Sequence, residues 1–340
     1  MNAPATLAAA RAGDQAAFEG LVAPHRAALQ AHCYRMLGSV QDAEDALQEA
    51  LLRAWRGLDG LREAEGLRAW LYRIATNACL RQIERRPRRV VPLDYGTAGD
   101  PHAPLAAPLE ETAWVEPFPL GELDADAPAA RYEQREGVEL AFVAALQHLP
   151  ARQRAVLILR DVLGFSAREV ADALDTTPAS VDSAMQRARA TVERRLPERS
   201  QQATLRALGD ERLTALVGGF VDAWERADVD ALVAMLADEA TISMPPIPTW
   251  FRGREAVTVF LRRILSPSRV RRLVPVPALG GLTFAQYWPS DVDPDRLVAH
   301  AILTVALDPA DPTRIGTLVA FLDAGLFPRF GLPESLDQPF

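Results

Sequence analysis

The sequence contains no lysine, so arginine supplies all 37 of its basic residues. It has two cysteines, Cys33 and Cys79, whose spacing excludes a disulfide framework and a cysteine-based zinc site. No apolar run approaches the roughly 20 residues that a membrane-spanning helix needs. The N-terminal stretch reaches Arg11 and Asp14 before the apolar core of a signal peptide could form. We therefore expect a cytoplasmic protein with no membrane contact, no metal and no cofactor.

Charge is unevenly distributed along the chain. The formal net charge of −8 argues at first against binding to nucleic acid. However, residues 1–92 carry a net charge of +3 and residues 137–199 a net charge of +1, whereas residues 93–136 carry −8 and residues 200–340 carry −4. Two neutral-to-basic segments are thus separated by an acidic strip. The length of 340 residues suits two or three domains.

The first segment, residues 7–86, has the pattern of successive helices. Residues 42–55, DAEDALQEALLRAW, place their apolar side chains on one stripe and acidic side chains in the first turn, where the helix dipole favours them. A second helix is expected over residues 67–84, because Pro87 cannot continue it. Residues 93–130 then lose all periodicity and are rich in proline and acidic residues, which indicates a linker that is extended or disordered in isolation.

Residues 138–196 have the pattern of a helix-turn-helix. A scaffold helix over residues 151–162 is followed by a short helix that Ser166 and Glu169 begin with a capping box. After a tight turn, a last helix begins at about Pro178 and carries several arginines. Such a second helix fits the major groove of DNA, although an αα-hairpin with a solvated arginine-rich face has the same pattern.

The last segment changes character. Two helices, at about residues 210–226 and 229–237, precede a strand-like stretch and a further helix at about 254–265. Strand-like runs separated by turns of glycine, proline and aspartate follow. Helices followed by a curved antiparallel sheet indicate an α+β domain.

Together, DAEDALQEALLRAW, RAWLYRIATNACL and the helix-turn-helix resemble regions 2.2–2.4 and region 4 of the extracytoplasmic-function branch of the sigma-70 family. The resemblance covers residues 7–196. It implies a multidomain protein with two all-α sigma domains, region 2 over residues 1–92 and region 4 over residues 131–199, joined by the linker at 93–130. The expected function is promoter recognition and transcription initiation, not catalysis.

The resemblance also implies roles for individual residues. The polar face of the first helix would dock on the β′ subunit of core RNA polymerase, although most such faces are merely solvated; its residues are Asp45, Gln48, Glu49 and Arg53. Asn77 would contact a flipped base of the promoter −10 element, although it could equally be a helix-terminal polar residue. The expected −10 set is Arg73, Asn77, Arg81, Arg85 and Arg86, and Arg88 and Arg89 would add contacts to the duplex backbone.

The last helix of region 4 would read the −35 element. Its expected contact residues are Thr177, Ser180, Asp182, Ser183, Gln186, Arg187 and Arg189. Asp182 and Ala184 stand where the family often has arginine, and a carboxylate repels phosphate unless it accepts a hydrogen bond from cytosine. This departure predicts a weaker or different −35 contact. The acidic linker is either a flexible spacer or, as in the family, a strand that threads basic channels of the polymerase β and β′ subunits as a mimic of nucleic-acid charge.

Residues 209–340 resemble the SnoaL-like cone-shaped α+β barrel, as a regulatory tail fused to a sigma factor. A second interpretation is an enzyme or a receptor for an unknown small ligand, with a pocket lined by Trp224, Met244, Trp250, Phe251, His300 and Phe321. The acid–base candidates are Asp238, His300 and Asp323, and no spacing singles one out. We therefore favour modulation in cis. The alternative for the whole chain is a DNA-binding transcription regulator with a ligand-sensing or enzymatic C-terminal domain.

Overall fold

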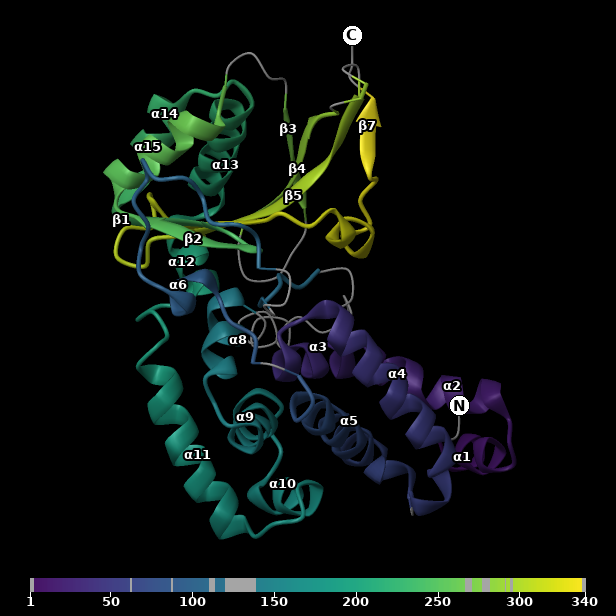
Figure 1. The fold of residues 1–340 in the computed structure, drawn as a ribbon. Helices are drawn as coiled ribbons and strands as arrows, with labels where there is room; N and C mark the ends of the chain where they lie inside the picture. The colour runs from purple at the N-terminus through teal and green to yellow at the C-terminus, as the bar shows by residue number, and fades with distance from the viewer. Residues whose placement is uncertain are drawn as a thin grey trace. The chain divides into compact units, whose positions relative to one another are not determined.

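The computed structural model describes residues 3–61, 63–86, 88–109, 114–119, 139–266, 271–276, 282–290, 292–293 and 296–337. It divides the chain into two compact units (Figure 1). The helical unit comprises residues 1–89 and 122–196, and the C-terminal unit comprises residues 90–121 and 197–340. Among the described helices, none is both long enough and apolar enough to cross a membrane.

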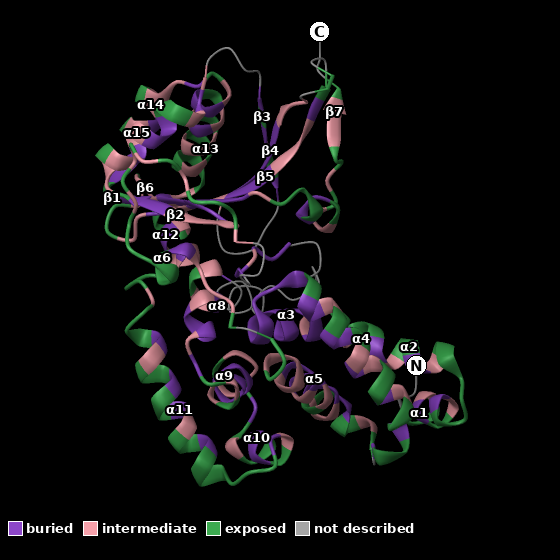
Figure 2. Cartoon of the chain, viewed as in Figure 1, coloured by how far each residue is buried: buried purple, intermediate pink, exposed green. Residues whose placement is uncertain are grey.

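The first helical half, residues 3–89, contains α1 (Ala3–Arg11), α2 (Gln15–Val22), α3 (Arg26–Leu37), α4 (Val40–Arg56) and α5 (Leu67–Ile83). Helices α3, α4 and α5 pack against one another. All residues of α3 from Leu29 to Leu37 are buried, so this helix forms the centre of the half (Figure 2). The Ser39 hydroxyl caps α4 by accepting a hydrogen bond from the Asp42 amide at 3.2 Å.

The second helical half, residues 139–196, contains α8 (Leu140–Gln147), α9 (Ala151–Leu157) with a following π-helical turn (Ile158–Val162), α10 (Ala167–Ala173) and α11 (Pro178–Glu193). The capping box expected at Ser166 and Glu169 is confirmed, and Thr177 caps α11. Helix α11 buries a stripe of apolar residues and leaves its other side exposed. Helices α10 and α11 therefore form the expected helix-turn-helix.

The C-terminal unit begins with α12 (Gln201–Leu208), α13 (Asp210–Glu225) and α14 (Val229–Ala234). The strands are β1 (Leu236–Met244), β2 (Ile247–Arg252), β3 (Arg272–Val276), β4 (Leu282–Pro289), β5 (Arg296–Leu307), β6 (Ile315–Phe321) and β7 (Ser335–Asp337), with α15 (Arg254–Ile264) between β2 and β3. Strand β1 begins at Leu236, so the helix expected to reach residue 237 ends earlier.

These strands form one mixed sheet in the order β2-β1-β6-β5-β4-β3, with β7 paired to β5. Strands β1 and β6 run parallel, and the other pairs are antiparallel. The hydrophobic core includes Phe220 and Trp224 of α13, Phe260 of α15, Ile242 of β1 and Phe284 of β4. Helices packed on one face of a curved sheet confirm the expected α+β fold.

The first part of the linker is structured and belongs to the C-terminal unit. After the short helix α6 (Pro92–Tyr95), residues 96–109 lie along β2. Gly99 N–H donates to the Trp250 carbonyl at 2.8 Å, and Leu109 N–H donates to the Pro246 carbonyl at 3.0 Å. Residues 93–109 are thus not a free spacer. Residues 110–113 and 120–130, which complete the expected linker, lie outside the described residues.

Candidate polymerase- and DNA-binding surfaces

The outer face of α4 carries the four residues expected to bind polymerase. Asp45, Gln48 and Arg53 are exposed and Glu49 is half-buried. The Glu49 carboxylate pairs with Arg53 at 2.6 Å, one turn along the helix, and with Arg81 of α5 at 3.4 Å. The structure therefore places all four side chains on one face, as the helical period predicts.

Leu52 lies on the same face of α4 and is 58% exposed. The sequence analysis assigned no role to Leu52, although its position outside the apolar stripe of the helix indicates that its side chain is exposed. A singly exposed apolar side chain is common on protein surfaces, so Leu52 is of interest only together with the polar residues that surround it on this face.

Helix α5 carries three of the expected −10 residues at a spacing of four, so they share one face. Arg73 is exposed and pairs with Asp175 of the helix-turn-helix turn at 3.4 Å. Asn77 is half-buried, and Arg81 pairs with Glu49. Arg85 is exposed just beyond the end of α5.

A buried hydrogen-bond network includes Thr76, the residue that precedes Asn77 on α5. The His32 ring is in hydrogen-bond contact with the Thr76 hydroxyl at 2.9 Å, and Thr76 donates to the Tyr72 carbonyl at 2.7 Å. Burial and, to a smaller extent, the positive charge of the nearby Arg35 lower the pKa of His32 to about 3. The ring is therefore neutral, and it anchors the α5 turn that bears Asn77.

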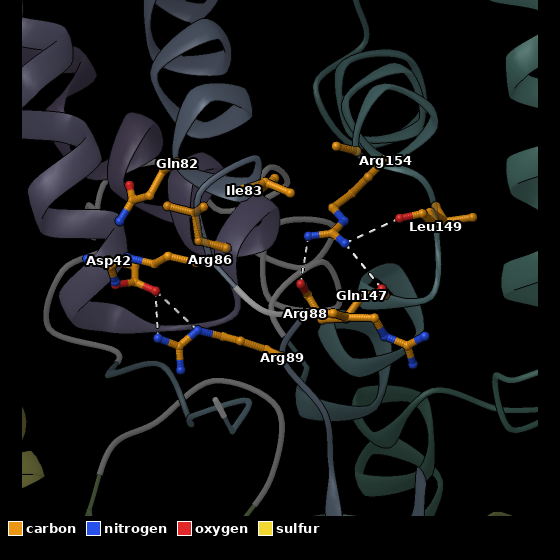
Figure 3. A pocket seen from close by; sticks show the side chains of 11 residues that line it. Asp42, Gln82, Ile83, Arg86, Arg88, Arg89, Gln147, Leu149 and Arg154 are labelled. Atoms are coloured by element: carbon orange, nitrogen blue, oxygen red, sulfur yellow. Dashed lines mark hydrogen bonds and ion pairs between the residues drawn. The ribbon is translucent and has the colours of Figure 1, made fainter. Parts of the chain in front are cut away.

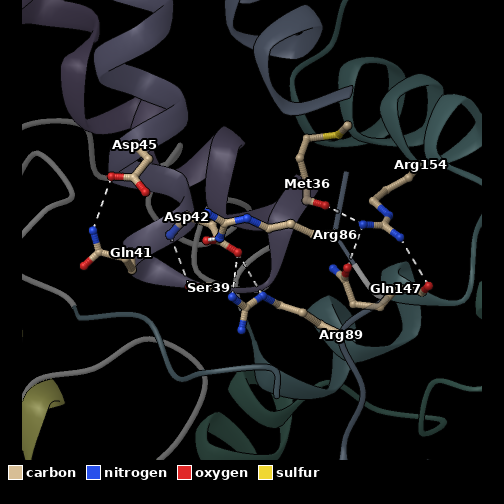
Figure 4. Close-up of polar contacts among 9 residues, drawn as sticks. All are labelled: Met36, Ser39, Gln41, Asp42, Asp45, Arg86, Arg89, Gln147 and Arg154. Carbon is tan, nitrogen blue, oxygen red and sulfur yellow. Dashed lines mark hydrogen bonds and ion pairs between the residues drawn. The ribbon is translucent and has the colours of Figure 1, made fainter. Parts of the chain in front are cut away.

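Asp42 binds two of the arginines expected to meet DNA (Figure 4). Its side chain is 4% exposed, pairs with Arg86 and pairs with Arg89 at 2.5 Å. Arg89 also donates through Nε at 3.2 Å. Sequence reasoning read Asp42 only as a first-turn acid, because a long-range pairing leaves no periodic signal.

The two helical halves pack against each other through α3 and α5 on one side and α8, α9 and α10 on the other. We call this contact the helical interface. At one end, the buried Arg154 donates to the Met36 carbonyl across the interface and to the side-chain oxygen of Gln147 at 2.6 Å. Gln147 in turn donates to the Arg35 carbonyl at 3.4 Å.

At the other end of the helical interface, Arg68 of α5 donates to the Leu163 carbonyl at 2.8 Å. Its guanidinium lies over the Phe165 ring at 4.3 Å, and the Tyr72 and Phe165 rings meet edge to face at 5.4 Å. The Arg73–Asp175 ion pair adds a contact at the same end. The helical interface thus combines buried backbone-directed bonds with aromatic packing.

The expected −35 residues lie on the exposed side of α11. Thr177 and Ser180 are engaged in the helix cap, where the Ser180 amide donates to the Thr177 hydroxyl at 3.2 Å. Arg189 pairs with Asp161 at 2.5 Å. The remaining exposed members of the set are Asp182, Ser183, Gln186 and Arg187.

The structure does not bring the six expected pocket residues of the C-terminal unit together around one cavity. Trp224, Met244 and Phe251 pack within the hydrophobic core. Trp250 pairs in register with Ser243, and its side chain lies on the face of the sheet opposite to that of its core neighbour Phe251. The Trp250 indole N–H donates to the Gly96 carbonyl at 3.0 Å. Phe321 is also buried, but on the face of β6 opposite to that of the core residues Leu318 and Ala320.

His300, the remaining member of that set, stacks on Trp288 at 3.9 Å between ring centroids. Burial lowers its pKa to about 4. Of the other acid–base candidates, Asp238 has a side chain that is 88% exposed and paired with Arg254, and Asp323 accepts a hydrogen bond from the Gly325 amide. The three candidates do not form a shared site, and among the described residues no group of three or more suits a metal ion.

Comparisons with known proteins agree with this arrangement. Family models match residues 21–89 as Sigma-70 region 2, residues 139–192 as Sigma-70 region 4 and residues 217–314 as a SnoaL-like domain. The chain is 41% identical over 338 residues to the ECF RNA polymerase sigma factor SigG of Mycobacterium tuberculosis, covering 96% of this chain and 86% of that protein. The chain belongs to the ECF RNA polymerase sigma factors.

Two further relatives show how far the likeness extends along this sigma factor. The ECF sigma factor SigM of Mycobacterium tuberculosis is 33% identical over 190 residues, which cover 56% of this chain and 82% of SigM. The crystal structure of the ECF sigma factor SigJ of the same organism aligns with a TM-score of 0.57 at 24% identity, over 93% of this chain and 98% of that one. SigJ therefore shares the fold of this sigma factor over nearly its full length.

Proposed function

We propose that this sigma factor binds core RNA polymerase through the exposed face of α4 and directs it to promoters. The observation that supports this most strongly is that Asp45, Gln48, Glu49 and Arg53 share one face of α4, around the exposed Leu52. An apolar centre with a charged rim is the usual composition of a protein interface. The family resemblance assigns the partner surface to the β′ subunit.

Promoter contact is proposed for the exposed surfaces of α5 and α11. Asn77 offers both a donor and an acceptor to an unstacked base. On α11, Gln186 and Arg187 stand exposed along the helix, in a geometry that a major groove accepts. The −10 and −35 elements are about 25 base pairs apart, or about 85 Å at 3.4 Å per base pair. The two halves cannot reach both elements while the helical interface is closed, so promoter binding opens it.

A charge-reversed α4 face tests the polymerase assignment. The variant Asp45→Arg/Glu49→Arg should lose capture by core RNA polymerase, because it replaces both carboxylates of this face with positive charge. A control with the same change of net charge, Asp222→Arg/Asp230→Arg in α13 and α14, should be captured like the unchanged protein. Capture of the α4 variant at the unchanged level, with normal helicity, would remove this interface from the proposal.

The C-terminal unit is proposed to modulate transcription in cis by holding the linker. Besides the backbone bonds of Gly99 to Trp250 of β2 and of Leu109 to Pro246 just before β2, the Ala106 amide donates to the Thr249 hydroxyl at 3.2 Å. Arg263 of α15 donates to the Pro101 and Ala103 carbonyls at 2.6 and 2.8 Å. A linker held along β2 is unavailable to a polymerase channel. Release of the linker is therefore the step at which the C-terminal unit acts.

A further inference from the structure

Carboxylates pair with several of the arginines that the sequence assigns to DNA. Asp42 pairs with Arg86 and Arg89 at the wall of a cavity of about 190 Å³ in the helical unit (Figure 3). Asp161 pairs with Arg189 of α11. The Asp42 side chain is 4% exposed, whereas the side chains of Asp161 and Arg189 reach the surface of the helix-turn-helix. The Asp161–Arg189 pair therefore lies where it can affect the −35 contact directly.

The contact between Asp161 and Arg189 is bidentate. The Arg189 Nε donates to one carboxylate oxygen at 2.9 Å, and Nη2 donates to the other at 2.5 Å. The carboxylate thus occupies one of the edges with which a guanidinium group binds a phosphate. The hydrogen bonds and the negative charge of Asp161 raise the pKa of Arg189. The arginine is therefore fully charged, and its charge is balanced within the protein.

The turn that carries Asp161 is anchored in the core. Asp161 lies in the π-helical turn Ile158–Val162, whose first two residues are buried. Arg160 of the same turn donates to the Phe165 carbonyl at 3.0 Å, and α11 packs on α9, the helix that the turn extends. Turns of this kind are rare and often lie at functional sites. Asp161 is therefore presented to α11 by the packed part of the helix-turn-helix.

Arg187 stands two residues before Arg189 and differs from it in its surroundings. It is exposed, and within the described part of the chain no carboxylate pairs with it. Positions two residues apart on an α-helix are about 200° apart around its axis, so the two arginines point to opposite flanks of α11. A helix in the major groove has a phosphate backbone on each flank. Glu193, one turn beyond Arg189, adds a second carboxylate to the Arg189 flank.

We propose that Asp161 keeps Arg189 from binding promoter phosphate, so that α11 contacts the DNA backbone from its Arg187 flank alone. A phosphate that displaced Asp161 would have to break two charge-assisted bonds, and the displaced carboxylate would then face the DNA. A phosphate that used the remaining N–H groups of Arg189 would lie beside the same carboxylate. Asp161 is thus a positioning residue that weakens the −35 contact. This inference rests on the proposed role of α11 as the reader of duplex DNA.

Fluorescence anisotropy of the full chain tests the inference. The probe is a labelled duplex that the unchanged protein selects from a random-sequence library, measured across a salt series. Asp161→Asn releases Arg189 and should steepen the slope of log affinity against log salt by about 0.9, the value of one added phosphate contact. The variant should therefore bind roughly eightfold more tightly at 0.1 M salt, with a difference that vanishes toward 1 M.

Three further variants separate this effect from general charge and from a structural role. Asp161→Glu keeps the carboxylate and should bind like the unchanged protein. Asp161→Asn/Arg189→Gln should return to the unchanged slope, because it removes the arginine that the first substitution releases. Asp172→Asn makes the same change of net charge at an exposed position of α10 and should leave the slope unchanged. Asp161→Ser has the same expected result as Asp161→Asn and replaces it if circular dichroism shows lost helicity.

The outcomes distinguish this inference from the proposed function. An unchanged slope in a folded Asp161→Asn, while Arg187→Gln makes the slope shallower, would overturn the role of Asp161 and leave α11 as the DNA reader. Equal steepening in Asp172→Asn, or steepening that persists in the double variant, would show that Arg189 is not the group released. Slopes that respond to neither Arg187→Gln nor Asp161→Asn would refute the proposed DNA contact of α11, and this inference with it.

Discussion

Among single residues, His32 shows how a buried polar group links the core to a surface. Its ring is in hydrogen-bond contact with Thr76 next to Asn77, and the whole side chain is buried in α3. A hydrogen-bonded neutral imidazole is tolerated in such a core, whereas an imidazolium is not. The contact therefore stabilises the fold only while the ring is unprotonated.

This gives a pH prediction with a definite sign. The unfolded chain takes up a proton on His32 near pH 6.5, whereas the folded chain does so only near pH 3. Stability is therefore lost as the pH falls below 6.5, by about 1.4 kcal/mol per pH unit from this residue. Denaturant unfolding of the unchanged protein and of His32→Asn between pH 7 and pH 4 should show a shallower slope for the variant. Parallel slopes would mean that His32 titrates normally, and the exposed His102→Asn is the matched control.

At the same scale, promoter opening is proposed for Asn77. Replacing it with alanine removes a donor and an acceptor from the α5 face but leaves the His32–Thr76 contact in place. Asn77→Ala should reduce open-complex formation by about 1–3 kcal/mol, the value of one good base contact, with polymerase capture intact. Permanganate footprinting of the −10 region measures this, beside Glu84→Ala as an exposed control. An unchanged open-complex yield would contradict the assignment.

Among the elements, α11 is the proposed reader of duplex DNA. Arg187 is exposed on it, whereas Arg189 is already paired with Asp161. Arg187→Gln should therefore weaken binding to promoter duplex and reduce the slope of log affinity against log salt by about one, as for one lost phosphate contact. Fluorescence anisotropy across a salt series measures both quantities. Arg212→Gln on α13 should change neither, and an unaltered slope in Arg187→Gln would place its side chain away from the phosphates.

The helices themselves could be predicted from the sequence because their signals are local. The apolar stripe of α4, the Ser166–Glu169 capping box and the Thr177 cap each depend on residues a few positions apart, and the structure contains all three. Pairings between distant residues have no such signal. The burial of Asp42 beneath Arg86 and Arg89 depends on partners more than forty positions away.

The C-terminal pocket and the linker show the same limit at larger distances. Strand alternation alone does not say which face of a sheet a helix will cover, so Trp250 and Phe251 were placed in one pocket although they point to opposite faces. The proline-rich composition of the linker showed that it forms no regular helix or strand. It did not show whether the linker contacts the rest of the protein. Its partner strand β2 lies about 150 positions further along the chain.

At the scale of the whole molecule, the linker is the segment through which the C-terminal unit is proposed to modulate transcription. Gly99 allows the linker backbone to approach β2 closely, since a Cβ atom at this position would lie 2.9 Å from Cγ2 of Thr249. Contacts under 3.0 Å force a shift, and Thr249 is held in β2. A side chain at position 99 therefore forces the linker away from β2.

Gly99→Val should release residues 96–109 and raise promoter-dependent transcription several-fold, because the freed linker becomes available to the polymerase. Hydrogen exchange should show faster exchange of the Gly99-site and Leu109 amides, which are bonded to the Trp250 and Pro246 carbonyls in the unchanged protein. Ala98→Val, at an exposed neighbouring position, adds the same side chain without the clash and should leave both measurements unchanged. If exchange shows that Gly99→Val has freed the linker, and run-off transcription with core polymerase still equals that of Ala98→Val, the docked linker does not restrain this sigma factor. The C-terminal unit would then have to act through another contact.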